Sequence, residues 1–258
     1  MSILHTAIFV PTFNALLYIQ QILPNHDLGI AIIIITLIIR GILYIPSLAA
    51  IKASRQLQEI QPMDKALQAK YKGDSQKLAQ ERMKLYKEHK VNPAASCLPI
   101  VIQILVFYQL YQVFLHGLQV NDAGFLKPDQ LKDLYPALQG YFSTHAINMK
   151  FLNIVDLQAA HNWILAIVSG AAQFWQTKML AAPKEPNIPG ARDESLTATT
   201  NRTMMYVLPF MTALIAYRFP SGLALYWAAS TIFTILQQYI FLRRHPLKKA
   251  VEVINAQE

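Results

Sequence analysis

Long apolar stretches separated by polar connections dominate the hydrophobic pattern of the chain. A helix needs roughly 20 predominantly apolar residues to cross the hydrocarbon layer of a bilayer. The last two stretches are separated only by Arg218–Ser221, which predicts a tight turn at a membrane surface. The pattern therefore predicts an all-α polytopic membrane protein with a core of five transmembrane helices. The five stretches that meet or approach this length are residues 28–50, 96–115, 162–180, 204–217 and 222–242.

Residues 1–27 form an N-terminal external segment whose relation to the membrane the pattern leaves open. Residues 3–23 are apolar enough to enter lipid, but they contain Pro11, Asn14 and two glutamines. No Lys or Arg precedes them to form the positive start of a signal peptide. The favoured interpretation is an amphipathic helix that lies in the outer membrane interface, and the alternative is a sixth span.

A different periodicity follows the first span, in residues 51–92. Apolar residues recur there at steps of three and four, which predicts a helix with one apolar face. We expect Pro62 to kink or restart this helix, Gly73 to end it, and Asp74 to cap a second helix that ends near Lys90. The prediction is a cytoplasmic helical hairpin, either a solvated connector or a mobile arm that contacts anionic lipid headgroups or an incoming chain. The apolar positions are Ala53, Leu57, Ile60, Met63, Leu67 and Tyr71.

Composition and charge support the membrane interpretation and predict an orientation. Only 15% of the 258 residues are charged, against about 25% in a typical soluble protein. Ten Lys and Arg lie in residues 51–95, four in 178–203 and four in the basic tail 243–258, but only three lie in 116–161. Because cytoplasmic loops carry the excess of Lys and Arg, the chain is predicted to sit in the cell (cytoplasmic, inner) membrane with its N-terminus outside and its C-terminus in the cytoplasm.

The same distribution bears on nucleic-acid partners. The net charge of +8 comes from basic residues gathered on one predicted side of a membrane and not on a folded binding face. This excludes direct DNA binding as the explanation of the basic composition. Ribosomal RNA beside the basic tail remains open.

One charged residue interrupts the first span. Arg40 lies 12 residues into it, and a central arginine costs roughly 2.5–3.5 kcal/mol on insertion scales. None of the 15 acidic residues lies within any of the five stretches, so an internal ion pair is improbable. Water, polar side chains or a visiting carboxylate must compensate the charge instead.

The spans also contain polar uncharged residues, which are costly where they face lipid. They are expected to point inward and to line a wet concavity together with Arg40. The alternative is that the glutamines only join helices through interhelical hydrogen bonds. The polar residues are Thr36, Gln103, Gln109, Gln112, Gln173, Gln176, Thr234 and Gln237.

Several other functions find little support in the sequence. A single cysteine, Cys97, excludes an intrachain disulfide and a multi-cysteine metal site, and it is expected to be a small buried apolar residue. The spans contain no acid, Ser221 lacks a glycine-flanked nucleophile pattern, and no histidine pair has zinc-ligand spacing. We therefore expect the protein not to be an enzyme and to bind neither a metal nor a cofactor.

A secondary transporter or channel with Arg40 in the solute path is a stronger alternative than an enzyme, although the chain shows no inverted repeat. Lipid scrambling is a third possibility.

Four ordered motifs stand out at residues 61–78, 83–93, 97–103 and 219–227. The last of them reads Phe-Pro-Ser-Gly-Leu-Ala-Leu-Tyr-Trp and is followed by Gln237 and Gln238. Together these motifs resemble the YidC-type membrane protein insertases (the YidC/Oxa/Alb family), and the resemblance covers roughly residues 28–242. The chain departs from the family pattern at Phe151–Leu157, at Arg218, and in carrying no lipobox cysteine or large domain ahead of the core.

The resemblance implies a specific fold and site. The family fold is a five-helix core with a cytoplasmic hairpin, and Arg40 matches an arginine in a hydrophilic groove that is open to the cytoplasm and lipid but closed outward. Trp227 matches the tryptophan of the last motif, although aromatic residues beside an outer turn are equally typical of an interfacial belt. Gln173 or Gln176 matches a groove glutamine. Thr36 and Gln103, predicted above from their polarity within the spans, are added to the expected substrate-binding groove.

The implied function is insertion of nascent membrane proteins into the bilayer. Arg40 would attract acidic residues of the translocated tail. The expected partners are nascent membrane proteins and membrane lipids, and a Sec-type translocon and the ribosome are candidate partners.

Overall fold

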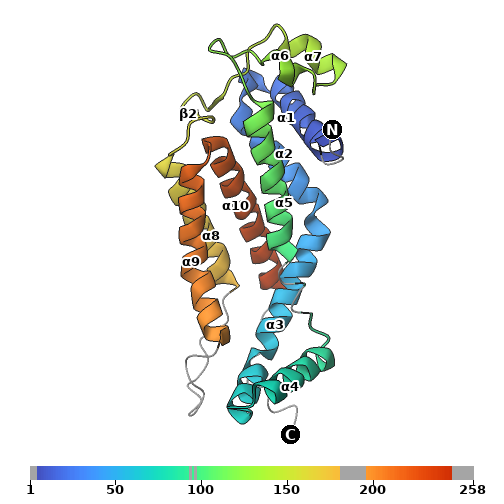
Figure 1. Cartoon of the computed structure of the whole chain (residues 1–258), viewed down its shortest axis with the longest axis vertical. Coiled ribbons are helices and arrows are strands. Elements are labelled where there is room, and N and C mark those ends of the chain that lie inside the picture. The colour runs from blue at the N-terminus through green and yellow to red at the C-terminus, as the bar shows by residue number, and fades with distance from the viewer. Residues whose placement is uncertain (1–4, 93–94, 96–97, 181–195, 246–258) are drawn as a thin grey trace. The chain divides into compact units, whose positions relative to one another are not determined.

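The computed structural model describes residues 5–92, 95, 98–180 and 196–245, with the backbone alone at 98–100 and 196–204. The chain divides into two compact units. Unit 1 comprises residues 1–43, 102–173 and 209–233, and unit 2 comprises 44–101, 174–208 and 234–258. Figure 1 labels most of the elements. The longer helices are α1 (Val10–Ile22), α2 (Leu28–Ile42), α3 (Tyr44–Lys70), α4 (Ser75–Glu88), α5 (Leu98–Gln112), α8 (Trp163–Met179), α9 (Leu196–Arg218) and α10 (Ser221–Arg244).

Shorter elements complete the described residues. Single π-helical turns lie at His5–Phe9 and Val113–Gly117, and a 3-10 turn lies at Pro24–His26. The short helices α6 (Pro128–Leu131) and α7 (Pro136–Phe142) follow the second π-helical turn. Strands β1 (Lys150–Phe151) and β2 (Val155–Asp156) pair antiparallel, with Lys150 opposite Asp156.

The first predicted span, residues 28–50, is not one continuous helix. It is interrupted at Leu43, between the end of α2 and the start of α3. Among the described residues, no single helix is both long enough and apolar enough to cross a membrane, and α2 and α3 meet that requirement only when they are taken together. Cys97, which was expected to be buried, and residues 246–258 of the basic tail fall outside the described residues.

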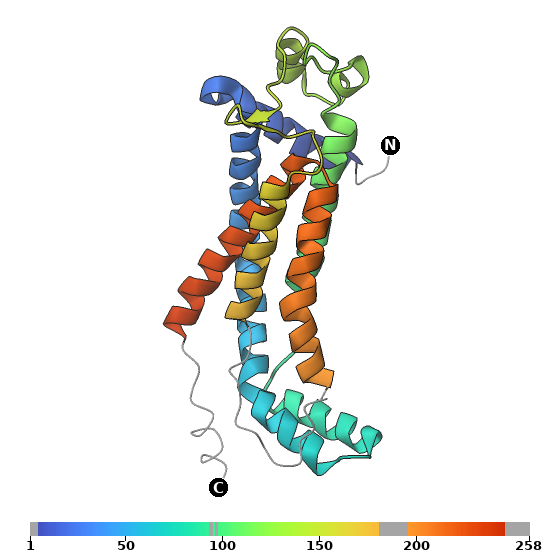
Figure 2. The same cartoon turned by 90° about the vertical axis from the view of Figure 1, so that its left-hand side faces the viewer.

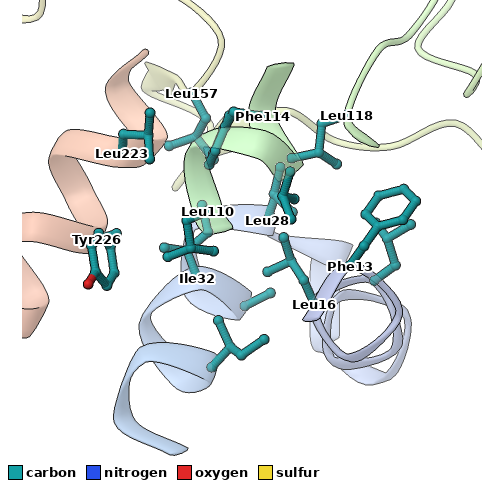
Figure 3. Close-up of a cluster of buried hydrophobic side chains, with 14 of the residues drawn as sticks. Phe13, Leu16, Leu28, Ile32, Leu110, Phe114, Leu118, Leu157, Leu223 and Tyr226 are labelled. Carbon is teal, nitrogen blue, oxygen red and sulfur yellow. The ribbon is translucent and has the colours of Figure 1, made fainter. Parts of the chain in front are cut away.

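Apolar side chains from distant parts of the sequence form the core of unit 1. Figure 3 shows this cluster between α1, α2, α10 and the end of α5. Its members are fully or almost fully removed from solvent, and burial of a large aliphatic side chain contributes roughly 1.5–3 kcal/mol. The labelled residues are Phe13, Leu16, Leu28, Ile32, Leu110, Phe114, Leu118, Leu157, Leu223 and Tyr226.

Polar residues of the N-terminal segment attach it to the loop that follows α5. The buried amide of Asn14 donates to the Asp133 carbonyl at 2.8 Å and accepts from the Tyr135 backbone N–H at 2.7 Å. These bonds satisfy a polar group inside an apolar segment, and α7 packs beside α1 (Figure 1). The predicted N-terminal helix is present as α1, and its position in the membrane interface stays a prediction.

Asp27 joins the start of α2 to a distant loop through hydrogen bonds of its carboxylate. Its Oδ1 accepts from the Ile30 backbone N–H at 3.0 Å, which caps the helix, and its Oδ2 accepts from the Leu152 N–H at 2.6 Å. Phe151 packs directly over Gly29, where an added Cβ would collide with its ring. The start of α2 is therefore held by the β1–β2 loop.

In unit 2, helices α3 and α4 pack against each other, and both contain residues of the segment 51–92 that was predicted to be a hairpin (Figure 2). Gly73 has a φ of +97°, and the Asp74 side chain accepts from the Lys77 N–H at 2.9 Å, so the predicted stop and cap are both confirmed. The buried Asp64 carboxylate pairs with Arg82 of α4 and accepts from Gln68 at 2.8 Å.

Helix α3 continues through Pro62, so of the two predicted outcomes, a kink or a restart, the restart was wrong. A proline inside a helix removes one backbone hydrogen bond. Buried Ile60 and Asp64 flank Pro62, and their packing and the Arg82 pair stabilise the helix across it.

Candidate functional site

Arg40 lies in the last turn of α2, within unit 1. The helix that carries it forms from an almost unbroken run of isoleucine, leucine and alanine after the Asp27 cap. Residue 40 is half-buried, in contrast to the fully buried Ile32 and Ile35 further up the helix. The guanidinium is thus placed at the less covered end of α2.

Two neutral side chains receive the hydrogen bonds of this guanidinium. Nε donates to Ser230 Oγ at 2.9 Å, and Nη2 donates to both Ser230 Oγ and Gln103 Oε1. Ser230 in turn donates to Gln103 Oε1 at 3.2 Å, and Gln103 Nε2 donates to the Tyr226 hydroxyl at 3.2 Å. Helices α2, α5 and α10 therefore meet in one polar network.

The network lies among buried groups on α10. Ser230 and Tyr226 are 0% and 2% exposed, and they are four residues apart, so they lie on the same face of the helix. Sequence reasoning predicted Gln103 but missed Ser230. The sequence feature that could have indicated Ser230 is its position four residues after Tyr226 of the last motif, which places both residues on one face of the helix.

Arg40 has no acidic partner in the described part of the chain. The ion pairs of the described residues involve other side chains, such as Arg82 with Asp64 and Lys132 with Asp129. Serine and glutamine oxygens carry only partial charges, so the positive charge of Arg40 is solvated but not neutralised. A guanidinium in this state can still donate to a carboxylate in its planar fork geometry.

Thr36 and Trp227 are not hydrogen-bond partners of Arg40. Thr36 is buried one turn before Arg40, and its hydroxyl donates to the Ile32 carbonyl of its own helix at 2.6 Å. Trp227 packs edge-on against Phe107 with ring centroids 5.2 Å apart, beside Phe219. The structure therefore brings Arg40 and Gln103 together and directs Trp227 to an aromatic cluster.

Gln173 and Gln176 lie on α8, and both are half-buried. Gln173 belongs to unit 1 and Gln176 to unit 2. Neither is a hydrogen-bond partner of Arg40, whose partners in the described chain are Ser230 and Gln103. Which of the two glutamines faces a groove stays a prediction. Within the described residues, no three His, Cys, Asp or Glu side chains gather as metal ligands.

Comparisons with known proteins identify the family of this chain. The family model described as 60Kd inner membrane protein matches residues 18–249. Membrane protein insertase YidC of Fusobacterium nucleatum is 31% identical over 218 residues, which are 84% of this chain and 87% of that protein. Membrane protein insertase YidC of Nitratidesulfovibrio vulgaris is 31% identical over 235 residues, which are 91% of this chain but 38% of that protein.

A solved structure is also similar. It is described as an active YidC insertase with the first transmembrane domain resolved, and it matches with a TM-score of 0.57 and 25% sequence identity over 93% of this chain and 47% of its own. The chain therefore belongs to the 60Kd inner membrane protein family, in which the similar proteins above carry the name YidC. It spans less than half the length of some of these relatives and most of the length of others.

Proposed function

We propose that this chain is a membrane protein insertase, which guides nascent membrane proteins into the bilayer through a hydrophilic groove that contains Arg40. The observation that carries the proposal is a half-buried guanidinium with only neutral hydrogen-bond partners. The names of the relatives support the same activity. In this proposal Arg40 attracts acidic residues of the tail that must cross the membrane.

The strength of that attraction fits a transient contact. Two unit charges 4 Å apart gain about 4 kcal/mol at an effective dielectric of about 20, before desolvation is subtracted. Desolvation reduces this gain, so in this proposal the contact recruits a tail and then releases it. Ser230 and Gln103 keep the guanidinium oriented between visits, because they accept its hydrogen bonds without cancelling its charge.

Partitioning of the substrate into lipid completes the transfer. Burial of apolar surface gains roughly 25 cal/mol per Å², so the apolar segment of a substrate moves into lipid without another energy source. The polar tail is the obstacle, because polar and charged groups are costly in hydrocarbon. A polar site inside the membrane lowers that cost over part of the path.

The test is insertion of a small single-span substrate with an acidic tail into liposomes that contain the purified chain, measured by protection of the tail from protease. Arg40→Ala is expected to reduce insertion at least tenfold, since about 1.4 kcal/mol of lost attraction is a factor of ten. Arg40→Lys is expected to retain part of the activity, because it keeps the charge but not the planar fork. A substrate whose tail carries Asn and Gln instead of acids is expected to be much less sensitive to both changes.

Arg218→Ala is the matched control. Arg218 is exposed at the end of α9 and lies outside the polar network, so its loss is expected to leave insertion unchanged. Full insertion of the acidic substrate by Arg40→Ala would contradict the electrostatic role. Arg40-dependent flux of a tracer solute without insertion would favour a transporter instead.

A further inference from the structure

A cavity of about 640 Å³ lies in unit 2, between the first half of α3 and the last turns of α10. Its lining contains none of the residues of the Arg40 network, and it is partly open to the outside of the protein. Both of its walls belong to unit 2. The lining residues are Tyr44, Ile45, Leu48, Ala49, Lys52, Arg55, Gln56, Glu59, Gln237, Ile240, Phe241, Arg244 and His245.

The lining changes from apolar to cationic in the same direction along both walls. On α3 the apolar residues Ile45 and Leu48 precede Lys52 and Arg55. On α10 the apolar residues Ile240 and Phe241 precede Arg244. Three cations therefore gather at one end of the cavity, against the single carboxylate of Glu59.

This change coincides with two predicted membrane boundaries. The first apolar stretch ends at residue 50 and the last one ends at residue 242, and the cations follow within a few residues of each end. Hydrocarbon meets charged headgroups at such a boundary, and the predicted orientation makes it the inner one, where anionic lipids attract basic residues.

Arg55, at the cationic end of the cavity, has one N–H group without a hydrogen-bond acceptor. Its Nη1 donates to Gln58 Oε1 at 3.1 Å, and its Nη2 donates to the His245 carbonyl at 3.2 Å. Its Nε is buried and has no hydrogen-bond partner. A buried unpaired donor is costly, and an anionic oxygen is the acceptor that compensates it best.

The two walls of the cavity are joined by buried hydrogen bonds. Ser47 donates to Gln237 Oε1 at 2.8 Å, and Gln237 Nε2 donates to the Tyr44 carbonyl at 3.2 Å. Gln237 and Ser47 are both buried. The cavity is thus formed before any ligand arrives, which lowers the entropic cost of binding.

We infer that this cavity binds one anionic phospholipid, with its phosphate at Lys52, Arg55 and Arg244 and the first part of an acyl chain along Ile45, Leu48 and Ile240. The volume suits a headgroup with a short piece of chain, and the remainder of the lipid extends into the bilayer. A free phosphate satisfies only the cationic end, whereas an anionic lipid satisfies both ends. Basic pockets between membrane helices on the cytoplasmic side bind such headgroups.

The test is a titration of the purified full-length chain in detergent with dihexanoyl phosphatidylglycerol, read by native mass spectrometry. Arg244→Gln is expected to weaken binding about fivefold, and the double variant with Lys52→Gln about 25-fold, since each basic residue near an anionic headgroup contributes about 1 kcal/mol. Arg243→Gln is the matched control, because Arg243 is adjacent, exposed and equally charged but does not line the cavity.

The other arms separate this site from its alternatives. Dihexanoyl phosphatidylcholine, the chain-free headgroup glycerophosphoglycerol and inorganic phosphate are each expected to bind at least tenfold more weakly than the anionic lipid. Equal weakening by Arg243→Gln and Arg244→Gln would overturn the cavity as the site, because it would indicate general surface attraction. Equal binding of any of the three other ligands would overturn the assignment to an anionic lipid. The readout is binding, so it stands whether or not the chain inserts proteins.

Discussion

Ser230 sets the immediate surroundings of Arg40. It accepts hydrogen bonds from two nitrogens of the guanidinium and donates one to Gln103, and it is completely buried. A carboxylate in its place would neutralise the charge, whereas a hydroxyl only orients it. Together with Gln103, this hydroxyl orients the guanidinium and leaves its charge able to attract a second chain.

Ser230→Ala is expected to weaken both the fold and the proposed activity. Loss of the shared acceptor leaves donors of Arg40 short of partners, which costs about 1–3 kcal/mol in the free energy of unfolding. Insertion of an acidic-tailed substrate is expected to fall several-fold, because the guanidinium is no longer held in position. Thermal unfolding in detergent and the insertion assay measure the two effects.

Ser169→Ala provides the control for this change. Ser169 is equally buried, and its hydroxyl donates to the Ala224 carbonyl at 3.2 Å, away from Arg40. This variant is expected to lose stability without a change in insertion per folded molecule. The same fall in insertion for both serines would argue against a specific role of Ser230.

Small residues decide how closely helices approach each other. Gly170 on α8 lies beside Ala213 and the Pro209 carbonyl of α9, and a Cβ built on it would stand 2.9 Å from Ala213 Cβ and 3.2 Å from that oxygen. Close helix contacts in membrane proteins rely on such small residues. Apolar periodicity alone gives no indication that this glycine is the point of contact.

Gly170→Ala is expected to destabilise the chain by about 1–3 kcal/mol, because α8 and α9 must separate to admit one methyl group. Gly140→Ala on α7 is the control, since nothing lies within 4 Å of its added Cβ. Alanine there is expected to be neutral or to stabilise by about 0.5–1 kcal/mol, as it does in a helix interior. Equal melting temperatures of the two variants would contradict the close approach at Gly170.

At the scale of the whole molecule, the bias of basic residues predicts which side each loop faces. The test uses a background with Cys97→Ala and adds Lys87→Cys on α4 or Asp129→Cys on α6, both exposed positions. A membrane-impermeant maleimide is expected to label position 129 in intact cells and position 87 only after permeabilisation. The reverse pattern would contradict an external N-terminus and a cytoplasmic C-terminus.

The sequence by itself determined the features that depend on neighbouring residues. Apolar runs predicted helices, Gly73 and Asp74 predicted the turn between α3 and α4, and the lack of acids in the apolar stretches marked Arg40 as a charge without an internal partner. Each signal comes from backbone preference or side-chain polarity within a few residues. The helix break at Leu43 departed from this local prediction, and α3 passes through Pro62 without the restart that was one of the two outcomes expected there.

The tertiary structure alone decided which distant side chains meet. Ser230 is 190 residues from Arg40, Asn14 bonds a loop 121 residues away, and Trp227 turns to Phe107 and not to the guanidinium. Periodicity assigns a residue to a face of its own helix, but the packing of whole helices determines which face of another helix lies opposite. Hydrogen bonds act over about 3 Å, so their partners become known only when that packing is known.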